Sequence, residues 1–118
     1  MIQLEIMKST ESKISPQLEK GYLSIANEII EALARTKMSA YQSRIIMAIL
    51  RRTYGFHKKE DQISIWRIAN MTGIRETHVS RTLKELEMRK IICRRGKIIG
   101  FNKYYDQWKN LPKGIRGY

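Results

Sequence analysis

The side chains best suited to molecular recognition surround the apolar positions Val79, Leu83 and Leu86. The i, i+4, i+7 spacing of these positions predicts a helix with one buried face. At about 100° per residue, the opposite face carries four side chains: Thr77, Arg81, Lys84 and Met88. His78 flanks that face, and the first turns of such a helix can reach base edges in a DNA major groove. We therefore predict three base contacts: Thr77, His78 and Arg81, whose fork can meet guanine O6 and N7.

A second group of cations lies at the start of this helix, along it and at an expected hairpin tip. The group comprises Arg75, Lys84, Arg94, Arg95 and Lys97. Cations in such positions attract phosphate oxygens without reading the base sequence. We therefore predict that this group contacts the DNA backbone.

Each of these residues also has an ordinary interpretation. Arg81 and Lys84 could be solvated helix charges paired with Glu85 and Glu87, and His78 could be a surface histidine. The hairpin cations are the stronger signal, because three basic residues fall within four positions. Four further cations are interpreted as solvated surface rather than as an extended phosphate footprint: Arg51, Arg52, Lys58 and Lys59.

Composition supports a polyanionic partner. The chain has 118 residues, enough for one compact domain, and its formal net charge is +12. Residues 91–118 carry seven Lys and Arg against a single acid, Asp106, which gives +6 for that segment. A basic excess concentrated at one end of a chain suits a polyanion such as nucleic acid, although a generically basic surface is the ordinary alternative.

Several other classes of protein are disfavoured by the sequence. Cys93 is the single cysteine, and His57 and His78 are the two histidines, so zinc-ligand spacing is lacking and no metal or cofactor is expected. We see no Gly-rich phosphate loop or paired carboxylates, and we expect no enzymatic activity. A single cysteine indicates a reducing compartment, and the sequence shows no membrane-spanning run and no signal peptide, so we expect a cytoplasmic protein.

The elements that must position these residues can be located from local signals. An apolar stripe predicts a first helix over Ser24–Arg35. A second helix begins at Ser39, where Ser39 and Gln42 have capping-box spacing, and Gly55 could supply its left-handed cap. Its expected buried face comprises Tyr41, Ile45, Ala48 and Ile49. A short strand is possible at Gln62–Ile63.

The second half of the chain predicts a helix-turn-helix followed by a hairpin. Ser64 is a suitable N-cap for a third helix, and Gly73 breaks that helix before the fourth. Strand-like runs follow at Ile91–Arg94 and Lys97–Phe101, with a turn at Arg95-Gly96. The expected fold is mainly α with a small β-hairpin, a winged helix-turn-helix of four main helices plus a wing.

The domain organisation follows from this order. We predict an N-terminal arm or linker over residues 1–20, a winged-helix DNA-binding domain over residues 21–110, and a basic tail over residues 111–118. Alternating apolar residues at 2, 4 and 6 could form a strand in a dimer contact, or a mobile terminus. An aromatic element containing Tyr104, Tyr105 and Trp108 is expected to close back on the core.

Short segments spread along residues 21–108 match one known family. In chain order they are Gly21-Tyr22, Ile25-Ala26-Asn27-Glu28, Glu31-Ala32-Leu33, Arg52-Thr53-Tyr54-Gly55-Phe56 with Lys58-Lys59, Ile63-Ser64, Thr72-Gly73-Ile74, His78-Val79-Ser80-Arg81 and Lys84-Glu85-Leu86. Through them the chain resembles the N-terminal domain of the bacteriophage replication protein O family. The stretch Thr53–Phe56 is the most specific, whereas the pattern around Thr72–Leu86 is shared with many winged-helix regulators.

The resemblance implies binding to repeated sites at a phage replication origin, with His78 and Arg81 carrying recognition. It also implies a replicative helicase or its loader as a partner, through a C-terminal region absent from this chain, in the bacterial host cytoplasm. The chain departs from the family at Arg75-Glu76-Thr77, where Ser and basic residues are usual. Loss of that N-cap costs about 1 kcal/mol, and Glu76 suggests a different target sequence.

Other functions are compatible with the same features. A winged-helix transcriptional regulator is the main alternative, and a protein–protein adaptor is a further one that the net charge of +12 disfavours. A homodimer is expected, because symmetric DNA sites are commonly bound by two-fold symmetric dimers. The candidate dimer contacts are residues 2–6 and the first helix.

Overall fold

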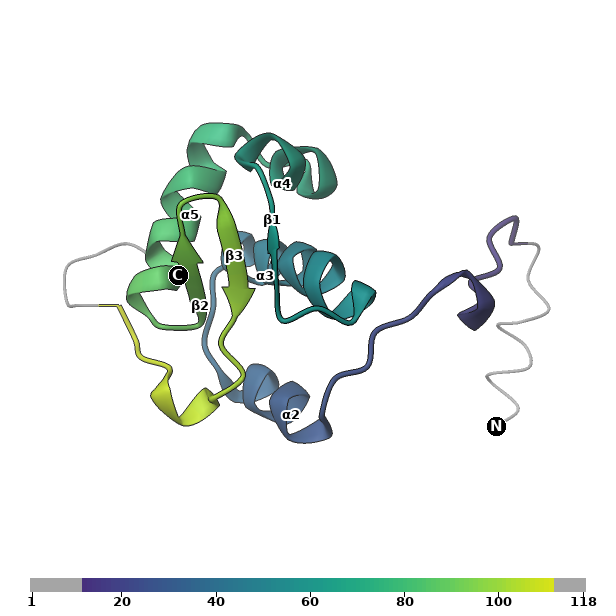
Figure 1. The fold of residues 1–118 in the computed structure, drawn as a ribbon, viewed down its shortest axis with the longest axis horizontal. Helices are drawn as coiled ribbons and strands as arrows, with labels where there is room; N and C mark the ends of the chain where they lie inside the picture. Colours follow the sequence, from purple (N-terminus) through teal and green to yellow (C-terminus); the bar gives the residue numbers. More distant parts are fainter. Residues whose placement is uncertain (1–11, 112–118) are drawn as a thin grey trace.

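The computed structural model describes residues 12–111, and Figure 1 shows their arrangement. Within this range the elements are η1 (Leu18–Lys20), α2 (Asn27–Arg35), α3 (Ala40–Thr53), η2 (Tyr54–Phe56), β1 (Glu60–Gln62), α4 (Ile65–Thr72), α5 (Glu76–Met88), β2 (Ile92–Arg95), β3 (Ile98–Phe101) and η3 (Tyr105–Gln107). None of these helices is long and apolar enough to cross a lipid bilayer. From α3 onward the order is helix, strand, helix, helix, hairpin, which is that of a winged helix, so the expected fold class is confirmed.

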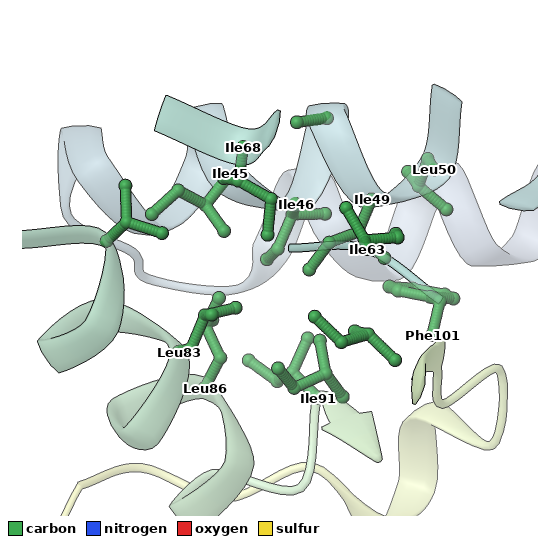
Figure 2. Packing of buried hydrophobic residues seen from close by; sticks show 14 of the residues in the cluster. Ile45, Ile46, Ile49, Leu50, Ile63, Ile68, Leu83, Leu86, Ile91 and Phe101 are labelled. Carbon is green, nitrogen blue, oxygen red and sulfur yellow. The ribbon is translucent and has the colours of Figure 1, made fainter. Parts of the chain in front are cut away.

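Helix α3 forms the centre of the core. Its Ile45 and Ile49 are fully buried and pack in one cluster with Leu83 and Leu86 of α5 (Figure 2). Ile68 of α4, also fully buried, belongs to the same cluster. Burying side chains of this size stabilises a fold by about 1.5–3 kcal/mol each, so the position of α5 on α3 is strongly specified.

The start of α3 is fixed by its predicted capping box. The Ser39 hydroxyl accepts from the Gln42 backbone N–H at 3.0 Å, and the Gln42 carbonyl oxygen accepts from the Ser39 N–H at 3.4 Å. Both predicted partners are therefore confirmed. The prediction that Tyr41 lies in the buried face is wrong: Tyr41 is 37% exposed, because its ring lies beside His78 on α5 and outside the core cluster.

The three strands form an antiparallel sheet in the order β1-β3-β2. Ile99 of β3 is opposite Asp61 of β1 and Arg94 of β2, and its side chain is buried against the core. The hairpin turn lies at Gly96 and Lys97, one residue later than expected, because Arg95 still pairs with Ile98. The first helix and the first strand also differ from expectation, beginning at Asn27 and Glu60.

Gly55 does not supply the left-handed cap predicted for α3. The chain continues from α3 into the turn η2, and the left-handed residue is His57, with φ of 57°. The left-handed residue comes two positions later than predicted because a 3-10 turn follows α3. His57 N–H donates to Tyr54 O at 3.0 Å and closes that turn. Gly55 instead makes room for Arg51, since a Cβ at this position would lie 2.9 Å from the Arg51 guanidinium.

The predicted aromatic element closes on the core, as expected. The Trp108 ring lies 5.6 Å from the Phe101 ring, and its Nε1–H donates to Asn102 O at 2.8 Å. The Tyr105 hydroxyl donates to the Glu28 carboxylate at 3.1 Å, which ties η3 to α2. Hydrogen bonding to Glu28 and its negative charge raise the pKa of Tyr105.

Other predictions concern the ends of the chain. The alternating strand, its proposed dimer contact and most of the basic tail lie outside the described residues. Residues 12–26 are almost entirely exposed and contain the single turn η1. The division into arm, domain and tail stays a prediction.

Candidate nucleic-acid interface

The helix-turn-helix consists of α4, the turn around Gly73, and α5. The Ser64 hydroxyl accepts from Arg67 N–H at 3.0 Å and so caps α4, as predicted. Gly73 adopts φ of 74° and its N–H donates to Ala69 O at 2.8 Å, which ends the helix in a left-handed cap. Ile74 then buries its side chain in the core and fixes where α5 begins.

We expect Gly73→Ala to lower the free energy of unfolding by about 1–2 kcal/mol, because a Cβ strains the left-handed conformation. The space itself is open, since the new Cβ would lie 3.6 Å from the Arg44 guanidinium. Urea unfolding measures the loss. Gly73→Asn is the matched control and should lose less, because Asn tolerates this conformation; equal losses for both variants would contradict the conformational explanation.

The exposed face of α5 presents the predicted base contacts. Thr77 and Arg81 are exposed, and His78 is half-buried between them. The Arg81 guanidinium donates to His78 Nδ1 at 2.8 Å. That bond holds one edge of the guanidinium while leaving its other donors available. The structure therefore brings the three predicted base contacts together on one patch of the first two turns.

Tyr41 adjoins this patch, although the sequence pattern assigned it to the core. Its ring centroid lies 5.5 Å from that of His78, at an interplanar angle of 44°. The ring therefore supports His78 from the side of α3. No local signal identifies this contact, because Tyr41 and His78 belong to different helices and only tertiary packing brings them together.

The start of α5 lacks a side-chain cap. Arg75 occupies the N-cap position, and its exposed side chain makes no capping hydrogen bond. This confirms the unusual helix start expected from Arg75-Glu76-Thr77. Glu76 lies in the first turn, where its charge suits the positive end of the helix dipole. Backbone N–H groups in the first turn of a helix can also donate to an anion.

The structure separates the cations of the hairpin. Arg94 is drawn back to α5, where its guanidinium lies 3.2 Å from the Glu87 carboxylate and its side chain is 20% exposed. Arg95 pairs with Glu60 at 2.9 Å, with 73% of its side chain exposed. Exposed pairs of that kind contribute about 0–1 kcal/mol, so Arg95 can exchange Glu60 for another anion at little cost. Lys97 is exposed in the turn itself.

Lys84 lies one turn beyond Arg81 and is exposed. In Figure 1 the turn between β2 and β3 lies at the same end of the domain as α4 and the start of α5. Within residues 12–111, we find no cluster of three or more His, Cys, Asp and Glu side chains able to hold a metal ion. Cys93 is exposed.

Comparison with known proteins identifies relatives of this chain. Residues 15–108 match the model of the family described as bacteriophage replication protein O. DNA replication protein gp18 of Salmonella phage P22 is 34% identical over 99 residues, covering 84% of this chain and 36% of the relative. Replication protein 15 of Enterobacteria phage phi80 is 39% identical over 95 residues, covering 77% and 32%.

Replication protein O of Escherichia phage lambda is 30% identical over 91 residues, covering 77% of this chain and 27% of the relative. The chain thus spans about a third of the length of the curated relatives that it matches. No solved structure matches it. The family match covers the whole helix-turn-helix and hairpin, and the chain belongs to the bacteriophage replication protein O family.

Proposed function

We propose that this chain binds double-stranded DNA sequence-specifically, at repeated sites of a phage replication origin, to help initiate replication. The observation that carries the proposal is the exposed patch of Thr77, His78 and Arg81 on the second helix of a winged helix-turn-helix. Such a helix enters a major groove with its first turns against base edges. The net charge of +12 and relatives named as phage replication proteins support the same function.

Within this function the two groups of side chains have different roles. The patch on α5 reads bases, with Arg81 on guanine as its strongest contact. The backbone contacts hold the helix in the groove without distinguishing sequences: Arg75, Lys84, Arg94, Arg95 and Lys97. The role is binding in the host cytoplasm, with no chemical step. A replicative helicase or its loader would join through sequence beyond this chain.

The first test is a salt titration of DNA affinity. If all five backbone cations each neutralise one phosphate, log K should fall with log salt at a slope of about −4.5. That slope corresponds to a loss of about 500-fold between 50 and 200 mM salt. Fluorescence anisotropy with a labelled duplex measures this loss of affinity. An affinity that does not change with salt would contradict the proposal and favour a protein–protein adaptor.

Footprinting on the encoding genome tests the origin assignment. Protected sites clustered as repeats within a replication gene support it, whereas sites over a promoter would indicate a transcriptional regulator. We further propose that two copies bind a symmetric site together. Sedimentation with and without DNA tests this, and a monomer at high concentration in both samples would refute the dimer.

A further inference from the structure

A basic pocket lies beside the hairpin turn, and its lining does not include the α5 patch of Thr77, His78 and Arg81. Its volume is about 290 Å³, and five residues line it: Arg52, Gln62, Ser64, Arg67 and Lys97. They come from the end of α3, the end of β1, the start of α4 and the hairpin turn. The hydrogen bond from Ile63 N–H to Lys97 O, at 3.0 Å, holds the turn against the start of α4. Figure 1 shows β1 running directly into α4 beside this turn.

The charge of this pocket is unbalanced. Three of the lining residues are cations, and within the described part of the chain none is a carboxylate. One carboxylate outside the lining partly balances this charge. Asp61 accepts from Arg52 at 3.0 Å and also lies 3.6 Å from Lys58. The other two lining cations, Arg67 and Lys97, form no ion pair with a carboxylate of the described residues. Cations that line one cavity repel one another unless an anion lies between them.

Arg52 is the lining cation with a fixed geometry. Its Nε is buried, and within residues 12–111 it has no hydrogen-bond partner. Asp61 holds the guanidinium in place through the terminal nitrogen, so the fork is already oriented. A buried donor without a partner costs about 1–3 kcal/mol, so positive charge at Arg52 is only partly compensated within the described residues.

The start of α4 supplies further donors to the same space. Ser64 is the N-cap residue and lines the pocket, so the first backbone N–H groups of α4 are directed toward this end. Helix N-termini and arginine forks together favour a tetrahedral oxyanion. We propose that the pocket binds one phosphate of the DNA backbone, held by Arg67, Lys97 and Arg52 where the hairpin turn meets α4. This inference rests on the proposed function and extends it to Arg52, Ser64 and Arg67.

A phosphate at this point has a specific consequence for recognition. The pocket is lined from α3, β1, α4 and the hairpin turn, and none of these elements carries a proposed base contact. Its phosphate would therefore fix the protein's register on the duplex and contribute equally to every sequence. Removing the contact should weaken binding without relaxing base preference.

The decisive variant is Arg67→Gln, which removes one charge from the pocket and keeps the Ser64 cap intact, because Ser64 bonds the Arg67 backbone. Lys103→Gln is the matched control, since Lys103 is exposed and belongs to the opposite end of the domain beside η3. At 100 mM salt, Arg67→Gln should lower affinity by roughly 5- to 10-fold on both cognate and random duplexes and reduce the salt slope by about 0.9. The control should do neither.

Two outcomes separate this inference from the proposed function. If the wild-type chain binds DNA and Arg67→Gln equals wild type, the pocket proposal is overturned while the proposed function stands. If the wild-type chain shows no salt-dependent DNA binding, both fail together, because no backbone phosphate is then bound.

A second measurement identifies the ligand. Titrating inorganic phosphate into the ¹⁵N-labelled protein should shift the backbone amides at the start of α4 in wild type and not in Arg67→Gln. Phosphate-induced shifts accompanied by an unchanged DNA affinity of Arg67→Gln would show a free-phosphate site and overturn the DNA assignment.

Discussion

Replacing Arg81 with alanine is expected to lower affinity for the cognate site by about 10- to 100-fold while leaving affinity for random DNA within a few-fold of wild type. A bidentate arginine–guanine contact discriminates against the wrong base by about 1–3 kcal/mol. The side chain is exposed and already oriented by His78 at 2.8 Å, so little ordering is needed on binding. Selection of bound sequences from random DNA measures the change in base preference directly.

Two further variants sharpen this test. Arg81→Lys keeps the charge but lacks the planar fork, so it should lose most of the base preference. Lys84→Gln lies one turn away on the same helix and should weaken all sequences alike, because a phosphate contact carries no sequence information. An Arg81→Ala variant that weakens cognate and random DNA equally would place Arg81 among the backbone contacts instead.

Replacing Gln42 with leucine is expected to reduce the free energy of unfolding by about 3 kcal/mol. Gln42 is fully buried and links α3 to two charged side chains, Glu85 of α5 and Arg89 just after α5. Its carbonyl oxygen accepts from Arg89 at 2.7 Å, and its amide donates to Glu85 at 3.1 Å. Leucine fills similar volume but removes one bond from the buried Arg89 and one from the half-buried Glu85, and hydrogen bonds to charged groups contribute about 1.5–3 kcal/mol each.

Urea denaturation compared with Gln17→Leu provides the measurement and its control. Gln17 is exposed in the arm, and the same substitution there should stay within about 0.5 kcal/mol of wild type. A loss below about 1 kcal/mol for Gln42→Leu would show that the network between α3 and α5 adds little to stability. Such a result would shift the explanation for the buried Arg89 from stability to conformational specificity.

Much of the fold could be predicted because its signals are local. The capping box at Ser39 and Gln42, the cap at Ser64 and the left-handed turn at Gly73 each depend on residues within four positions of one another. The exact ends of helices and strands were predicted less accurately. The 3-10 turn after α3 moved the chain reversal from Gly55 to His57, and the hairpin turn shifted by one residue to Gly96 and Lys97.

The exposed face of α5 could also be predicted, since the period of an α-helix determines which side is exposed once the other side is buried. Thr77, Arg81 and Lys84 are exposed as that argument requires. The spacing of His78 and Arg81, three residues apart, places the two on neighbouring turns. Their roles in DNA contact remain predictions for the experiments above.

The sequence by itself therefore determined the order of elements, the helix-turn-helix and the exposed face of α5, because each depends on periodicity or on short-range hydrogen bonds. Only the tertiary structure decided which charged side chains already have partners within the described residues. It turned Arg94 toward Glu87, joined Gln42 to Arg89 across 47 positions, and gathered Arg52, Arg67 and Lys97 around one pocket. Those contacts depend on how helices and strands pack, and no local pattern encodes the distance between side chains on separate elements.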